Sequence, residues 1–224
     1  MNKRALLITD VTRCFGPGGE LPVPSSEEAA ATTVSNINKL FKSADIFSGD
    51  FGEWSLIIIS RDWHDPNSPH FNKWPRHGVE FTEGSEFYPD LKIRADYVPV
   101  AIVSKGLGEV DGYSPFDPSP DVNIILIMPN GNAYPWKGDL DSLCKHFRVG
   151  SITNTGWAKN YCVEAGCLAA REKGYEVNLV TDATDGINVP TDPDNHMDNS
   201  DKRMQLAGVI FTTTDEVLRK FKSS

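Results

Sequence analysis

The sequence predicts an α/β protein, a three-layer α/β/α sandwich with a mainly parallel central sheet. Short apolar runs such as Ala5–Thr9 and Leu56–Ser60 alternate with longer segments of helical periodicity. Strands that are apolar along their whole length are typical of a parallel sheet with helices on both faces. A chain of 224 residues, 39% hydrophobic and 24% charged, is typical of one domain with a sizeable core. We therefore expect a single domain over residues 1–224.

The first helix is expected over Glu27–Phe47, with Ser25 or Ser26 as its N-terminal cap. The apolar residues of its buried face are Val34, Ile37, Leu40 and Phe41. A later helix is expected over Cys162–Lys173, where Gly174 is placed to end it. Two shorter helices are expected over Leu140–Phe147 and Asp215–Phe221.

Apolar character places the strands between these helices. The expected strands are Ala5–Thr9, Leu56–Ser60, Tyr97–Val103, Ile124–Met128, Gly150–Thr155, Tyr175–Thr181 and Ala207–Phe211. Ile124–Met128 is either a fourth strand of the sheet or part of an insertion. The polar stretches Gly16–Ser26, Asp65–Asp96 and Asp182–Asp201 are too long for simple turns, so we expect them to form the rim of a ligand site.

Loop insertions are expected near 65–96, 117–137 and 185–203. Segments 117–137 and 187–203 carry no motif that predicts a role, and His196 is expected at the surface.

Four polar residues each follow an expected strand closely. They are Asp10, Asp62, Lys105 and Cys162. In open parallel sheets, ligands bind beyond the carboxyl ends of the strands. We therefore expect these side chains to gather at one edge of the sheet.

Cys162 lies between an expected strand and the first turn of an expected helix. Backbone N–H groups and the helix dipole at such a place favour a thiolate, the reactive form of cysteine. Cys162 is therefore a candidate nucleophile. The alternative is a small buried residue in a strand–helix connection.

A metal site is indicated by Asp62, His64, His70 and His77, which lie within 16 residues. Mixed oxygen and nitrogen ligands suit Zn²⁺, Fe²⁺ or Mn²⁺. The alternative is a polar loop with scattered histidines. Asp10 and Lys105 are each ambiguous alone, because an Asp at a strand end is often a turn residue and a single Lys is usually solvated.

Taken in order along the chain, these residues form a pattern that resembles the nicotinamidase branch of the isochorismatase-like cysteine hydrolases. The resemblance covers Ala5 to about Asp185. Its motifs are Asp10…Phe15, Asp62-Trp63-His64…His70…Trp74-Pro75-Arg76-His77, Lys105-Gly106 and Gly156-Trp157-Ala158…Tyr161-Cys162-Val163.

The resemblance implies a catalytic triad. Cys162 matches the nucleophile that attacks a carboxamide carbon, and Asp10 matches the base that takes the thiol proton and later delivers it to leaving ammonia. Lys105 matches the third member, which holds Asp10. A cis peptide between Trp157 and Ala158 is implied, with the N–H groups of Ala158 and Cys162 forming an oxyanion hole.

The resemblance also implies a divalent metal, with zinc as the first choice and iron or manganese as alternatives. Asp62, His64 and His77 match its ligands, and His70 matches a fourth ligand that only some members have. In the family this metal anchors a pyridine nitrogen. Phe15 matches an aromatic residue that flanks the ring.

Trp74, like Phe15, matches an aromatic residue that flanks the ring. The other substrate-binding residues implied are Tyr113 and Trp157. The implied reaction converts nicotinamide to nicotinate and ammonia through a cysteine thioester, in NAD salvage, and pyrazinamide should also fit. A metal-free relative that cleaves another small amide remains an alternative, as does a non-catalytic metal- or ligand-binding relative.

The chain departs from the family pattern at four positions. Thr12 stands where relatives usually have Gln, and Cys14 replaces an acid. Asn160 stands where relatives often have Asp, and Gly78 where Cys often follows the last metal histidine. None of these changes removes a proposed catalytic group, but they concern the details of the substrate pocket.

A net charge of −9 argues against a nucleic-acid partner. The apolar run at the N-terminus is too short for a signal peptide, and no stretch approaches the length of a membrane span. The cysteines lack CxxC spacing, which is typical of a reduced protein. We therefore expect a cytoplasmic enzyme with a small-molecule substrate, which assembles as a homo-oligomer if it follows its relatives.

Overall fold

The computed structural model describes residues 3–42, 54–93, 96–108, 112–118 and 121–222. Within these residues, an eight-stranded sheet has the strand order β5-β4-β3-β2-β1-β6-β7-β8. Its strands are β1 (Lys3–Thr9), β2 (Leu56–Asp62), β3 (Val100–Lys105), β4 (Val122–Ile127), β5 (Ala133–Pro135), β6 (Val149–Gly156), β7 (Glu176–Thr184) and β8 (Ile210–Thr212).

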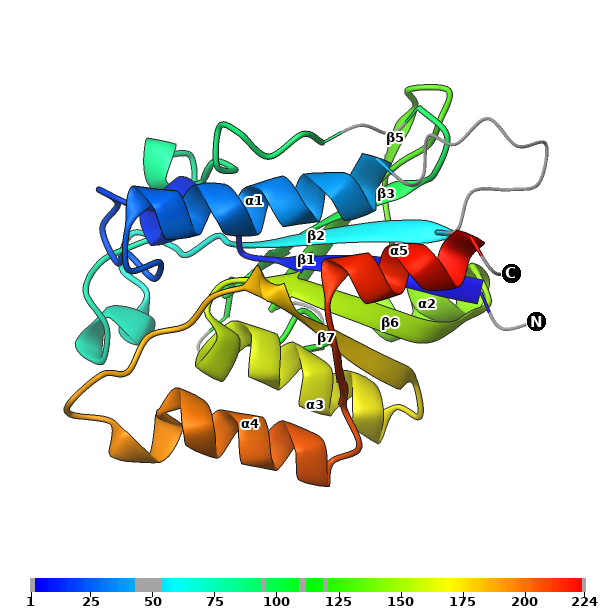
Figure 1. Ribbon diagram of the computed structural model, residues 1–224. Helices are drawn as coiled ribbons and strands as arrows, with labels where there is room; N and C mark the ends of the chain where they lie inside the picture. The colour runs from blue at the N-terminus through cyan, green and yellow to red at the C-terminus, as the bar shows by residue number, and fades with distance from the viewer. Residues whose placement is uncertain (1–2, 43–53, 94–95, 109–111, 119–120, 223–224) are drawn as a thin grey trace.

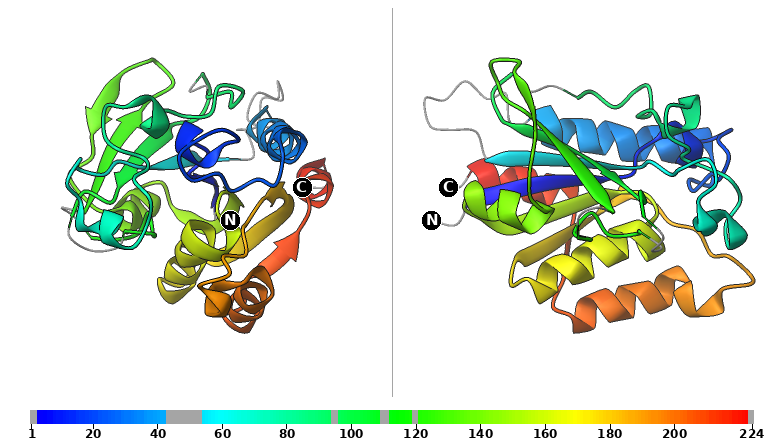
Figure 2. Two further views of the ribbon diagram at one scale, coloured as in Figure 1. Left: turned by 90° about the vertical axis from the view of Figure 1, so that its left-hand side faces the viewer. Right: turned by 180° about the vertical axis from the view of Figure 1, so that it is seen from behind.

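Helices cover both faces of this sheet (Figures 1 and 2). One face packs against α1 (Glu27–Lys42) and α5 (Thr214–Lys222), which also contact each other. The opposite face carries α2 (Leu140–His146), α3 (Glu164–Glu172) and α4 (Met197–Leu206). The buried apolar residues form two clusters, one on each side of the sheet. The predicted three-layer α/β/α sandwich is confirmed.

The sheet is mainly parallel, as predicted. Neighbouring strands among β3, β2, β1, β6, β7 and β8 are all parallel. In contrast, β4 pairs antiparallel with β3, and β5 pairs antiparallel with β4. The segment predicted as Ile124–Met128 is therefore a strand of the sheet. The strand order reverses beside β1, which lies between β2 and β6. In doubly wound sheets, such a reversal opens a crevice at the carboxyl ends of the strands.

The first helix, α1, begins as the sequence predicts. The Ser26 hydroxyl accepts a hydrogen bond from the Ala29 amide at 3.1 Å, so it caps the free N–H groups of the first turn. Glu27 and Glu28 lie in the first turn and basic residues in the last, which suits the helix dipole. The predicted end at Phe47 lies outside the described residues.

Most predicted boundaries differ from the structure by one to three residues, as three examples show. The predicted strand Tyr97–Val103 is shifted to β3, whose last residue is Lys105. The helix predicted over Cys162–Lys173 begins earlier, with a π-helical turn over Lys159–Val163 that leads into α3. The strand predicted over Ala207–Phe211 begins at Ile210, because Ala207 caps the end of α4 and a turn at Gly208 precedes the strand.

Within the described residues, no helix has both the length and the apolar character that crossing a membrane requires. All four cysteines are buried and free of disulfides.

Candidate active site

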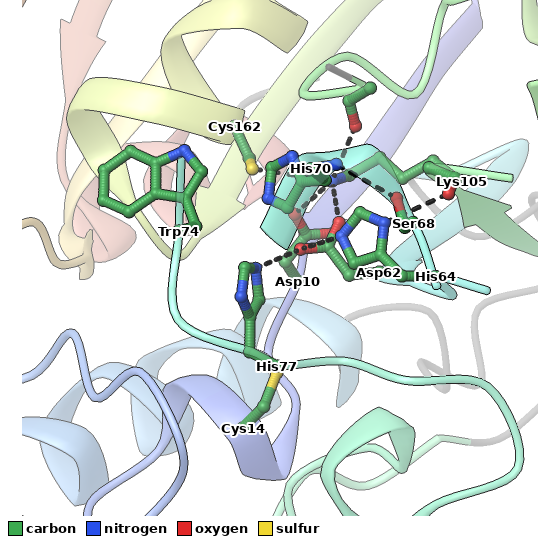
Figure 3. Close-up of polar contacts among 12 residues, drawn as sticks. Asp10, Cys14, Asp62, His64, Ser68, His70, Trp74, His77, Lys105 and Cys162 are labelled. Carbon is green, nitrogen blue, oxygen red and sulfur yellow. Dashed lines mark hydrogen bonds and ion pairs between the residues drawn. The ribbon is translucent and has the colours of Figure 1, made fainter. Parts of the chain in front are cut away.

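The four strand-end residues meet at one edge of the sheet, as predicted (Figure 3). Asp10 directly follows β1, and Asp62 and Lys105 are the last residues of β2 and β3. The register pairs Asp62 directly with Lys105. Cys162 lies in the π-helical turn that follows β6. The sheet register therefore assembles groups from four adjacent strands into one site.

Asp10 is fully buried and has a left-handed backbone conformation, with φ of 51°. Ser60 Oγ donates a hydrogen bond to Asp10 Oδ1 at 2.7 Å, and Lys105 Nζ lies 2.9 Å from Oδ2. Burial raises the pKa of this carboxyl above its ordinary value, although the Lys105 charge opposes the increase. A carboxylate with a raised pKa is a better proton acceptor than an exposed one.

Lys105 joins the groups of the site. Its buried ammonium contacts the carboxylates of both Asp10 and Asp62, the Gly112 carbonyl at 3.1 Å and Cys162 Sγ at 3.5 Å. Burial alone would lower the pKa of Lys105, but the nearby negative groups, Asp10 first among them, raise it well above its ordinary value. Lys105 is therefore a permanent cation within the site.

Cys162 is only 5% exposed. Burial raises the pKa of its thiol well above the ordinary range, with Lys105 opposing and the carboxylates of Asp10 and Asp62 adding to the increase. Desolvation thus opposes the thiolate that the helix start favours. Ligand atoms of Asp10, Asp62 and Cys162 lie within 4.8 Å of one another. The thiol thus has a nearby carboxylate that can take its proton.

The histidines of the predicted metal site lie together. Ring nitrogens of His64, His70 and His77 fall within 4.8 Å of one another. The Nδ1 atom of His64 contacts the Gly106 carbonyl at 3.0 Å, and that of His77 contacts the Pro75 carbonyl at 2.6 Å. Such contacts hold the proton on Nδ1 and leave Nε2 as a metal ligand.

The free ends of both rings point at one carboxylate. Asp62 Oδ2 lies 3.6 Å from His64 Nε2 and 3.4 Å from His77 Nε2. His64 Nε2 is buried and has no hydrogen-bond partner. Burial alone would raise the pKa of Asp62, but Lys105 and the two imidazoles lower it well below its ordinary value, so this group is ionised. An ionised carboxylate beside two oriented imidazoles fits a divalent metal of the zinc, iron or manganese type.

His70 stacks on His64, with ring centroids 4.4 Å apart and planes tilted by 16° (Figure 3).

The presence of glycine at position 106, in the Lys105-Gly106 motif, has a steric explanation. Gly106 has φ of +75°, and a Cβ at this position would lie 2.4 Å from His64 Cε1. Only glycine allows the His64 ring to approach this closely.

A largely apolar cavity opens above these groups. Its volume, including the open mouth, is about 550 Å³, and its lining includes Cys162 and the metal-site residues Asp62, His64, His70 and His77. The predicted substrate-binding residues Phe15, Trp74 and Tyr113 line it, as does Ala158. The cavity thus places aromatic rings, the candidate nucleophile and the candidate metal ligands around one small space.

Trp157 differs from the other predicted substrate-binding residues. Its ring is fully buried, packs edge-on against Tyr88 and is not part of the cavity lining. The peptide bond between Trp157 and Ala158 is cis, as the family resemblance implies. Trp157 therefore adjoins the site through its backbone.

Several residues of the site were missed by the sequence analysis. Ser60 lies inside the predicted strand and gives no signal of its own, although it is two residues before Asp62 and so shares its face of β2. The others line the cavity, and all except Tyr161, which lies in the π-helical turn, come from loops. They are Leu21, Pro22, Val23, Tyr161, Ile187 and Val189. The loop stretches that contain them were predicted to form the rim of the site, but these residues were not singled out.

Comparison with known proteins agrees with this arrangement. The Isochorismatase domain family model matches residues 113–216. Nicotinamidase of Escherichia coli (strain K12) is 29% identical over 236 residues, which cover 96% of this chain and 97% of that protein. Nicotinamidase of Saccharomyces cerevisiae is 24% identical over 211 residues, 81% of this chain and 87% of its own.

Among solved structures, the pyrazinamidase of Pyrococcus horikoshii in complex with zinc has a TM-score of 0.69 at 29% identity. The match covers 94% of this chain and 99% of that one. The sequence and structural similarities therefore extend over nearly the whole chain. The chain is thus similar to a nicotinamidase and a pyrazinamidase over nearly its whole length, and its residues 113–216 match the Isochorismatase domain model.

Proposed function

We propose that this protein hydrolyses nicotinamide to nicotinate and ammonia through a thioester on Cys162, as a step of NAD salvage. The observation that carries the proposal is the shared cavity. The thiol of Cys162, with Lys105 and Asp10 behind it, faces the same small space as the imidazoles of His64 and His77. The relatives of similar length that carry the name nicotinamidase support this substrate.

The cavity suits a planar aromatic amide. Phe15 and Trp74 offer apolar ring surfaces, and Tyr113 accepts a hydrogen bond from Trp74 Nε1 at 2.7 Å, which fixes both side chains. Holding a flat ring between such groups reduces the entropic barrier, because the carboxamide then lies at a fixed distance from the thiol.

Asp62, His64 and His77 would hold the divalent metal, with His70 beside them as a further candidate ligand. When bound, this ion would supply a Lewis-acidic anchor for the ring nitrogen of the substrate. The metal contributes to binding in this proposal, whereas the covalent chemistry belongs to the triad.

In the first half of the reaction, the proton of Cys162 Sγ passes to Asp10 and the sulfur bonds to the carboxamide carbon. The negative charge that develops on the amide oxygen is stabilised by the N–H groups of Ala158 and Cys162. Asp10 then delivers its proton to the nitrogen as the C–N bond breaks, so ammonia leaves and a thioester remains.

In the second half, water attacks the thioester carbon and gives a proton to Asp10. The C–S bond breaks, the proton on Asp10 returns to Cys162 Sγ, and nicotinic acid leaves and ionises to nicotinate by giving its proton to solvent. Lys105 stays charged throughout, since its raised pKa keeps it protonated, and it holds the Asp10 carboxylate beside the sulfur.

An ammonia-release assay with three amides tests the proposal. Nicotinamide and the isosteric pyrazinamide should both be hydrolysed, while benzamide, which lacks a ring nitrogen, should be a much poorer substrate. Equal turnover of nicotinamide and benzamide would point to a metal-independent hydrolase of another amide. No ammonia from any of the three would point to a non-catalytic binding protein.

A further inference from the structure

The segment between β7 and α4 forms part of the cavity wall. It leaves the carboxyl end of β7, runs out past the edge of the sheet and returns to the start of α4 (Figure 1). Ile187 and Val189 of this segment line the cavity. At its base, the Lys159 amide donates to the Asp185 carbonyl at 2.8 Å. The wall thus lies directly against the turn that carries the nucleophile.

One side chain of that turn contacts both ends of the wall. Asn160 is two residues before Cys162 and is 2% exposed. Its Nδ2 donates to the Ile187 carbonyl at 2.8 Å and also to the Asn195 carbonyl, and its Oδ1 accepts from the Ile187 amide at 3.2 Å. Two carbonyls on one side and an N–H on the other fix the orientation of the amide.

A carboxylate does not replace this amide. Aspartate, which relatives often have at this position, accepts from the Ile187 amide but has no N–H to donate. It would also place negative charge against the carbonyl oxygens of Ile187 and Asn195. The path of the wall in this chain therefore requires an amide at position 160.

We propose that Asn160 is a positioning residue that fastens the 187–195 segment to the nucleophile turn and so sets the size of the substrate pocket. The effect on substrate kinetics rests on the proposed amide hydrolysis, whereas the structural role of Asn160 does not. With the wall held in place, the pocket accepts a single six-membered aromatic ring and excludes substituents on the side that faces Ile187 and Val189.

Further contacts support the outer part of the wall. Tyr161 donates its hydroxyl proton to Asp192 Oδ2 at 3.1 Å, and Asn195 Nδ2 donates to the same oxygen at 2.9 Å. Arg203 of α4 donates to the Asp194 carbonyl at 2.7 Å. The outer part of the segment thus has its own supports, so the loss of Asn160 should loosen the inner part around Ile187 without unfolding the segment.

The first test is kinetic, with Asn160→Asp and Asn160→Ala. The KM for nicotinamide should rise about 10-fold, because the wall loses hydrogen bonds that place it against the ring. The kcat should change less than about threefold, since no catalytic group is removed. A nicotinamide with a methyl group on the ring should gain in kcat/KM relative to nicotinamide.

Asn178→Asp is the matched control. Asn178 is a buried asparagine on β7 whose side chain donates to Ser151 Oγ at 3.3 Å. The same chemical change there should leave KM and the order of substrates unchanged. A fall in kcat at constant KM in the Asn160 variants, or an equal loss for both amides, would overturn the proposal.

The second test does not need activity. Hydrogen exchange measured by mass spectrometry should show faster exchange of the peptide that contains Ile187 in both Asn160 variants, but not in Asn178→Asp. If the wild-type protein releases no ammonia from nicotinamide, the proposed function fails while this measurement still decides the role of Asn160. Unchanged exchange at Ile187 would refute that role.

Discussion

Asp62 and Lys105 occupy paired positions at the ends of β2 and β3, and their side chains form a buried ion pair. The other oxygen of Asp62 faces the imidazoles of His64 and His77. One carboxylate thus joins Lys105 to the candidate metal site. Any change of charge at one half of the site is transmitted to the other through Asp62.

Replacement of the nucleophile should abolish activity. Cys162→Ala has no sulfur to form the thioester, so ammonia release should fall by about 10⁴-fold or more. Cys144→Ala is the matched control, because that thiol is buried in the core away from the cavity. Ammonia assays on both variants, with circular dichroism to confirm the fold, check this. Appreciable turnover by Cys162→Ala would rule out the covalent mechanism.

On the acid side of the pH profile, activity should be lost at a higher pH than an ordinary aspartate would give; this pH is called the acid limit. Asp10 must be ionised to take the thiol proton, and burial raises its pKa above the ordinary 3.8. The value of kcat/KM should therefore fall, as pH decreases, at a pH clearly above 3.8. On the alkaline side, the raised pKa values of Cys162 and Lys105 keep both groups protonated to pH 9 or above. A pH series of initial rates tests both limits.

Ser60→Ala should move the acid limit further up. The Ser60 hydroxyl stabilises ionised Asp10 and so lowers its pKa. Without that hydrogen bond, Asp10 binds its proton more tightly and the acid limb should shift by about 1–2 pH units, as expected for the loss of one hydrogen bond to a charged group. Rates on the plateau should change little. A shift toward lower pH would contradict the role assigned to Ser60.

His64→Ala should lose metal and nicotinamide turnover together. The variant lacks one of the two imidazoles oriented toward Asp62. Elemental analysis of the purified protein should show metal near stoichiometric in the wild type and strongly reduced in the variant. Removal of metal from the wild type by chelation should lower its melting temperature, because a ligand of the native state stabilises that state.

His146→Ala is the control for this experiment, since His146 is an exposed residue at the end of α2. It should keep both metal and activity. Full nicotinamide turnover in thoroughly metal-free protein would contradict the anchoring role of the metal.

Gly156→Ala should destabilise the fold. Gly156 has φ of +108°, and a Cβ there would lie 2.0 Å from the Thr9 carbonyl oxygen. Because this neighbour is backbone, the clash cannot relax cheaply, and the free energy of unfolding should fall by about 3 kcal/mol or more. Gly166→Ala, where the nearest atom is 3.4 Å away in a helix, should be neutral or slightly stabilising. Chemical denaturation of both variants makes the comparison.

The sheet was largely predictable from the sequence because its central strands are continuous apolar runs. The strand Ala5–Thr9, for example, is fully buried in the structure. In contrast, α4 was missed because only Ser200 and Met204 are buried among its ten residues, which leaves no apolar periodicity. The strand β5 was missed because its three residues are all exposed.

The site was predictable where chemistry depends on residue type and strand position, as at Asp10, Lys105 and Asp62. It was not predictable where it depends on burial or on tertiary contacts. The sequence placed Cys162 at a helical start but gave no measure of its burial, which raises the pKa of the thiol. The stretch Asp182–Asp201 was predicted to lie at the rim of the site, but the sequence did not indicate which of its residues, Ile187 and Val189, line the cavity.

The candidate catalytic groups and part of the cavity lining come from different kinds of element, and this affects how the substrate range of such an enzyme can evolve. Asp10, Asp62 and Lys105 come from strand ends whose register fixes them, whereas Ile187 and Val189 come from a connection that no strand constrains. Mutations in that connection can change which amides fit the cavity, while the candidate catalytic groups at the strand ends keep their positions. A few substitutions in this loop should therefore be enough to change the substrate range, with no change to the residues at the strand ends.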